Sequence, residues 1–174
     1  MEVRALSIAG PFAYWIATGR VIEPFGAKSI EMRSWGTRHE DILVLLHISQ
    51  TRDYDFAFEF MDFGLKEAPK SSIVGAVTLK GTILYNSEEL FERDCRTHCW
   101  IGDNDYDYVV GECYGGKFPY GHIFTNPVVF NQPILNVPGD RGYWMPNPKK
   151  AKQYEVQKPA FLLATEQARE LMKV

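Results

Sequence analysis

The fold is decided by the stretch Lys28-Ser29-Ile30-Glu31-Met32-Arg33-Ser34-Trp35, which has the alternation of a short β-strand. With a period of two, Glu31, Arg33 and Trp35 point to one face of this strand. Ile30 and Met32 point to the other face, which we expect to pack against a core. The stretch is therefore apolar on one face and carries charged and aromatic side chains on the other.

The polar face carries side chains that suit a binding site. A guanidinium grips a phosphate or carbonyl in a planar fork, a carboxylate accepts from an exocyclic amine, and an indole stacks under a base. The alternative is a structural ion pair between Glu31 and Arg33 beside a half-buried Trp35, because such pairs cluster in the same way. Lys28 has the opposite parity, so it reaches this face only if the chain bends there.

Length and composition indicate one soluble domain. The chain has 174 residues, 45% of them hydrophobic and 24% charged, which is ordinary for a globular protein. Its net charge of −3 argues against a general nucleic-acid binder held by bulk electrostatics. Three cysteines, with no signal-like N-terminus, favour a cytoplasmic protein. No apolar run approaches the ~20 residues needed to span a bilayer.

The spacing of apolar residues predicts an α+β domain. The expected strands are 4–9, 42–48, 73–84, 122–130 and 132–137, and the expected helices are 11–18, 52–66 and 87–98. The segment 42–48 is apolar on both faces, so we expect it to be the central, doubly buried strand. These elements indicate a curved mixed or antiparallel sheet that forms a small barrel.

The remaining segments are predicted as follows. Residues 20–27 form a loop, 101–121 are irregular, and the Pro- and Lys-rich stretch 145–152 is a surface loop. A last strand-like run, 161–163, leads to a helix at 166–173 with Thr165 as its cap.

No metal or cofactor is expected. Asp103, Asp105 and Asp107 alternate like the start of a calcium loop, but tyrosines stand where that loop needs its glycine and its glutamate. The candidate zinc ligands are three cysteines and a histidine, Cys95, His98, Cys99 and Cys113. They lack a C-x-x-C knuckle, so a helix that packs two cysteines is the better account.

The order of motifs resembles the ASCH domain, a branch of the PUA-like superfamily. Its opening matches that family's strand, Pro-aromatic-Ala helix and Gly-x-Lys-x-x-Glu-x-Arg pattern, in Leu6-Ser7-Ile8, Pro11-Phe12-Ala13, Gly19 and Lys28 to Arg33. Further matches are the strand ending in His47, Ile73-Val74-Gly75-Ala76-Val77, Asn126-Pro127, Pro133, Gly139 and Gly142-Tyr143-Trp144. The resemblance implies that residues 1–174 are one ASCH/PUA-like domain, in which 145–174 extend the family core.

The resemblance implies a pseudo-barrel of five or six strands with flanking helices. It also implies a cleft, beside the strand that carries Lys28, Glu31, Arg33 and Trp35, which takes RNA or a nucleotide-like ligand. Some relatives are amidohydrolases on acetylated cytidine and others are ribonucleases. The amidohydrolases have a threonine nucleophile three residues after the lysine, where this chain has Glu31.

Three functional hypotheses follow, and the third is a protein-interaction domain in which the exposed aromatics of 101–121 and the basic tail meet a partner. The first is binding of RNA or a modified nucleotide, with a ligand set of Lys28, Glu31, Arg33, Trp35, His47, Tyr143 and Trp144. For His47 the other interpretation is a core histidine. The second hypothesis is a hydrolase of modified nucleosides or RNA, in which Lys28 and Glu31 move protons. Ser7 and Ser29 are its candidate nucleophiles, although neither lies in a recognised elbow.

Overall fold

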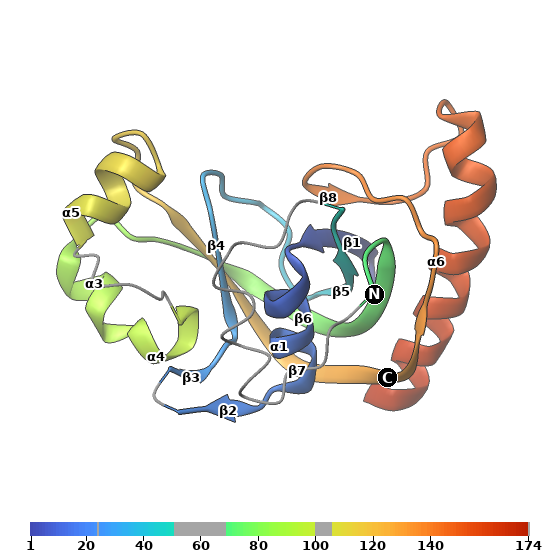
Figure 1. Cartoon of the computed structure of the whole chain (residues 1–174), viewed down its shortest axis with the longest axis horizontal. Coiled ribbons are helices and arrows are strands. Elements are labelled where there is room, and N and C mark those ends of the chain that lie inside the picture. The colour runs from blue at the N-terminus through green and yellow to red at the C-terminus, as the bar shows by residue number, and fades with distance from the viewer. Residues whose placement is uncertain (24, 51–68, 100–105, 174) are drawn as a thin grey trace.

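The computed structural model of the chain describes residues 1–174 apart from 24, 51–68, 100–105 and 174. Six strands form one sheet, curled into a half-barrel with helices on either side (Figure 1). In spatial order they are β4 (Ile30–Arg33), β7 (Tyr120–Ile134), β6 (Ser72–Leu84), β5 (Ile42–Ile48), β1 (Val3–Ile8) and β8 (Tyr143–Trp144). Only β1 and β5 are parallel neighbours in this sheet. The predicted α+β class with a curved, mixed sheet is confirmed.

Strand β5 is buried on both faces, as its sequence predicts, because a helix covers each side of the sheet. On one side, Val44 and Leu46 pack in a cluster with residues of α1 (Gly10–Thr18). On the other side, Leu43 and Leu45 pack in a cluster with residues of α6 (Ala151–Met172). All seven residues of the strand are buried. In Figure 1 the two helices lie on different sides of the sheet.

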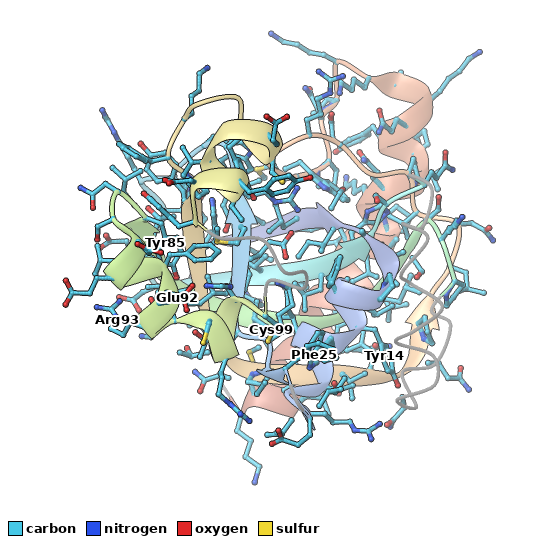
Figure 2. The ribbon with its side chains drawn as sticks, turned by 60° about the vertical axis from the view of Figure 1, so that its left-hand side comes forward. Tyr14, Phe25, Tyr85, Glu92, Arg93 and Cys99 are labelled. Atoms are coloured by element: carbon cyan, nitrogen blue, oxygen red, sulfur yellow. The ribbon has the colours of Figure 1, made fainter. Side chains whose placement is uncertain are left out.

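Strand β4 shows the predicted alternation. Ile30 and Met32 are buried in a third cluster, with Tyr85 and Phe91, while Glu31 and Arg33 on the other face are only partly buried. Phe91 comes from α3 (Glu88–Arg93), and Figure 2 shows Tyr85 beside this helix. The figure also places Glu92 and Arg93 on the outer side of α3, away from the core.

The helices of the middle of the chain are shorter than predicted. The helix expected over 87–98 divides at Asp94 into α3 and α4 (Cys95–His98). The segment expected to be irregular contains a turn of helix, α5 (Tyr106–Tyr108), and a π-helical turn, η1 (Val109–Cys113). Both bury side chains in the same cluster as Ile30 and Met32 of β4. Their local sequence pattern gives no sign of this burial, so the two turns were not predicted. The helix expected over 52–66 lies outside the described residues.

The helix predicted at 166–173 is part of α6, which ends at Met172, but the prediction for the residues just before it was wrong. The run 161–163, expected as a strand, and Thr165, expected as a helix cap, both lie inside α6. Thr165 donates from its hydroxyl to the Phe161 carbonyl at 2.7 Å, a bond within the helix. A short apolar run does not distinguish strand from helix. Packing against the sheet favours the helix, because a helix places one set of residues against it. The buried residues of α6 recur at helical spacing: Gln157, Phe161, Ala164, Thr165 and Ala168.

Strand β7 is one strand where two were expected. Its two prolines, Pro127 and Pro133, fall where the pairing with β6 shifts register. Proline lacks the N–H that a regular ladder needs, so an irregular site accommodates it without loss of a bond. A small second sheet, formed by β2 (Val21–Ile22) and β3 (Gly26–Ala27), occupies the predicted loop 20–27. Near it, Cys99 donates from its thiol to the Phe25 carbonyl at 3.4 Å, and Figure 2 shows the two residues together.

Among the helices in the described ranges, none is both long and apolar enough to cross a membrane.

Candidate functional site

A cavity of about 570 Å³ lies at the open side of the half-barrel. Strands β4 and β1 are not neighbours in the sheet, and the curl brings them together: Arg33 Nη2, from β4, donates to the Ser7 carbonyl of β1 at 2.9 Å. The lining residues come from four segments, and they are Leu6, Ser7, Arg33, Trp35, Ser49, Gln50, Pro138, Gly139, Asp140, Arg141 and Gly142. This cavity has the size of a small-molecule site.

Arg33 is the cation that the β4 strand contributes to the cavity wall. Its guanidinium lies 3.3 Å from Glu31 Oε1, in addition to its bond to the Ser7 carbonyl. Its Nε is buried and makes no hydrogen bond. A buried donor without an acceptor costs free energy, so the contacts of Nη2 with Ser7 and Glu31 must hold the guanidinium in place against this cost.

Lys28 and Glu31 lie behind Arg33 and do not line the cavity. Lys28 Nζ donates to the carbonyls of Ile30 at 3.0 Å and His98 at 2.7 Å, and it lies 3.5 Å from Glu31 Oε2. The chain therefore bends enough for Lys28 to meet the polar face of β4. Each oxygen of the Glu31 carboxylate therefore contacts one cation, Lys28 or Arg33. Of these three charged side chains, only Arg33 reaches the cavity.

Trp35 lines the cavity and is supported from behind by His122 and Tyr143. The Trp35 ring packs edge-on against both, with ring centroids 4.7 Å from His122 and 5.7 Å from Tyr143. His122 Nε2 lies 2.8 Å from the Trp35 carbonyl, which can only accept, so Nε2 carries the proton. Nδ1 then accepts from the Tyr143 hydroxyl at 2.9 Å. Burial lowers the pKa of His122, which keeps this arrangement neutral.

Ser7 and His47 form a second histidine–hydroxyl pair with the same connections. His47 Nε2 donates to the Val137 carbonyl at 2.8 Å, and Nδ1 lies 3.0 Å from Ser7 Oγ. Burial lowers the pKa of His47, so its Nδ1 is an acceptor for the serine. Trp144 Nε1 donates to the same Ser7 oxygen at 3.1 Å.

Gly139 lies directly over this pair. A Cβ at position 139 would stand 2.5 Å from His47 Cε1 and 2.7 Å from Ser7 Oγ. Only a residue without a side chain allows the 138–142 segment to approach the pair this closely. The segment thereby forms one wall of the cavity and covers His47, while Ser7 also lines the cavity.

The structure divides the residues predicted for the site into three groups. Arg33 and Trp35 line the cavity, and Lys28 and Glu31 stand behind Arg33. His47, Tyr143 and Trp144 belong to the layer beneath the cavity, and Trp144 is only 4% exposed. Sequence reasoning did not select His122 or Arg141. The glycines around Arg141 were part of the family motif, which was the available signal for this wall.

The described residues contain no cluster of three or more His, Cys, Asp or Glu side chains arranged to hold a metal ion. The four candidate zinc ligands are described and belong to no such cluster, whereas Asp103 and Asp105 of the calcium-like stretch lie outside the described residues.

Comparison with known proteins identifies the fold. No protein-family model matches the sequence, and no curated protein sequence matches it. Among solved structures, the ASCH protein of Zymomonas mobilis aligns with a TM-score of 0.52 at 13% identity, over 87% of this chain and 92% of that one. A tyrosine-to-phenylalanine variant of that protein aligns with a TM-score of 0.53 at 13% identity, over 90% of this chain and 99% of that one. The chain therefore has the fold of the ASCH domain.

Proposed function

We propose that the protein binds RNA or a nucleotide-like ligand, with a single nucleotide unit in the cavity. The observation that carries this proposal is that Arg33 and Trp35 both line one cavity of about 570 Å³. A cation and an indole next to each other are the elements that recognise a phosphorylated, aromatic ligand. The ASCH fold supports the proposal, because the family resemblance implies a cleft for such ligands at this strand.

Each side chain has a definite role in this proposal. Trp35 stacks on the base, a contact that contributes about 1–3 kcal/mol per base. Arg33 donates to an oxygen of the ligand, and Glu31 holds Arg33 in position through their 3.3 Å ion pair. The net charge of −3 favours a short ligand in a cavity over a long duplex held by many phosphate contacts.

The test is calorimetric titration with short single-stranded RNAs, the four nucleosides and their 5′-monophosphates. Trp35→Leu should weaken binding about 5- to 150-fold, since it removes the stacking surface. Phe118→Leu is the matched control, because Phe118 is 46% exposed and lies outside the cavity. Equal binding by both variants, or no binding by the unmodified protein at millimolar ligand, would contradict the proposal.

A hydrolase of modified nucleosides or RNA is the second candidate function. The observation in its favour is the 3.0 Å contact between Ser7 Oγ and the unprotonated Nδ1 of His47, the arrangement of a nucleophile and its base. Against it, Ser7 Oγ also accepts from Trp144 and is covered by Gly139. Incubation with acylated cytidines and short RNAs tests this candidate. Product formation that Ser7→Ala abolishes would support it, and the absence of product at high protein concentration would exclude it.

A further inference from the structure

We propose that the wall of the cavity formed by residues 138–142 is an anion site that holds the phosphate monoester of a mononucleotide. This inference rests on the proposed nucleotide binding and adds which charged group the ligand carries and where it lies. It comes from the hydrogen-bond pattern of this wall: the carbonyls of Val137, Pro138 and Gly139 already accept hydrogen bonds, whereas the backbone N–H groups of Gly139, Asp140 and Gly142 donate none to a described residue.

The carbonyl oxygens of four consecutive residues are directed to side chains outside the segment. They are Val137, which accepts from His47 at 2.8 Å; Pro138, from Gln157 at 2.7 Å; Gly139, from Gln153 at 2.9 Å; and Asp140, which lies 3.1 Å from Ser7 Oγ. The two glutamines come from α6 and the other two partners from the sheet. The segment is therefore anchored from two sides through its acceptors.

Most backbone donors of the same segment have no such partner; the exception is the Arg141 N–H, which donates to Asp140 Oδ1 at 2.9 Å. The backbone N–H groups of Gly139, Asp140 and Gly142 donate no hydrogen bond to any described residue. The Arg141 guanidinium also makes no hydrogen bond or ion pair with a described residue, and the Arg141 side chain is exposed. All four residues line the cavity. Successive free N–H groups beside a guanidinium are the usual surroundings of a bound phosphate.

The charges around the cavity favour the same ligand. The Asp140 carboxylate is paired with Lys150, whose hydrogen bond lowers the pKa of Asp140 and keeps it ionised. Glu31 is paired with Lys28 and Arg33. Both carboxylates near the cavity are thus paired with lysine or arginine, and Arg141, which is near Asp140 but forms no ion pair with it, adds a further positive charge at the wall. A phosphate monoester carries about −1.5 to −2 charges at pH 7 and accepts with three oxygens, which complements this wall.

A base or a sugar fits this wall less well than a phosphate does. Bases present donors as well as acceptors along their edges, whereas the carbonyls that would accept from them are already bonded. Trp35 supplies the surface for the base elsewhere in the same cavity. The ligand therefore extends from Trp35 to the 138–142 wall, with the phosphate at the wall.

The experiment compares the four nucleosides, their 5′-monophosphates and inorganic phosphate by calorimetric titration at fixed ionic strength. The unmodified protein should bind the monophosphates at least 10-fold more tightly than the nucleosides. Arg141→Met should remove about 10-fold or more of that preference and leave nucleoside binding unchanged, since hydrogen bonds to charged groups are the strong ones. Arg38→Met is the matched control, because Arg38 is also exposed and does not line the cavity. Both variants should melt at the temperature of the parent.

The outcomes separate this inference from the proposed function. Equal affinity for nucleosides and monophosphates, with no effect of Arg141→Met, would overturn the anion site and leave nucleotide binding standing. An equal loss of affinity in the Arg38 variant would also overturn it, since the preference would then reflect general charge. Binding of inorganic phosphate that Arg141→Met weakens supports the anion site, even if no nucleoside or nucleotide binds and the proposed function fails.

Discussion

At the scale of single residues, two buried histidines are built into the site in the same way. In His47 and His122, Nε2–H donates to a backbone carbonyl and Nδ1 accepts from a hydroxyl, of Ser7 and of Tyr143 respectively. Each histidine therefore links a strand of the sheet to a segment that borders the cavity. The polar atoms beneath the cavity are satisfied internally, which leaves Arg33, Arg141 and the backbone N–H groups as the donors for a ligand.

Gly139 is the residue at which this arrangement is most easily tested. Gly139→Ala should lower the free energy of unfolding by about 1–3 kcal/mol, because its Cβ would overlap His47 and Ser7. It should also weaken ligand binding, since the wall would move. Gly111→Ala is the control: a Cβ there meets nothing within 4 Å. Urea denaturation measures the free energy of unfolding of both variants. An equal effect of the two changes would show that the close approach at Gly139 is not required.

At the scale of elements, β5 and α6 have different structural roles. Strand β5 is the buried centre of the sheet, and α6 covers one face while its glutamines hold the 138–139 carbonyls. Helix α6 therefore contributes to a cavity wall as well as to the hydrophobic core. Removal of α6 would expose the second core cluster and release that wall.

Leu46 tests the contribution of β5. Leu46→Ala should cost about 2–5 kcal/mol, because Leu46 is fully buried and the truncated side chain leaves a cavity. Leu162→Ala, on the outer face of α6 where Leu162 is 54% exposed, should change the free energy of unfolding by less than about 0.5 kcal/mol. Chemical denaturation of both variants makes the comparison. A small effect at Leu46 would mean that β5 is not the centre of the core.

At the scale of the whole molecule, buried neutral histidines make stability depend on pH. Burial lowers the pKa of His47, His98 and His122, and that of His98 falls to about 4 from an ordinary value of 6.5. The unfolded chain then binds more protons than the folded one, so stability is fully present above pH 6.5 and is lost as the pH falls toward the folded pKa values.

Between pH 7.5 and pH 5, His98 alone should lower the free energy of unfolding by about 2 kcal/mol. Urea denaturation at the two pH values measures the loss. His98→Gln should reduce this loss, because glutamine cannot titrate. A stability that is constant over this range would show that these histidines are not desolvated in the folded protein.

The sequence by itself determined the elements whose burial follows a simple period. The alternation of β4, the doubly apolar β5 and the Pro-started helix α1 were all predictable, because one side chain in two or in 3.6 must face a core. Arg33 and Trp35 could be selected for the same reason, as polar and aromatic groups opposite an apolar face.

Only the tertiary structure decided the rest. It placed 161–163 in a helix, because the sheet offered an apolar face to a residue pattern that fits either structure. It also assembled the cavity, since Arg33 meets Ser7 only when the sheet curls, and the 138–142 wall reaches them only when α6 and β5 hold its carbonyls. Those contacts join residues far apart in the chain, and no local pattern encodes the distance between them.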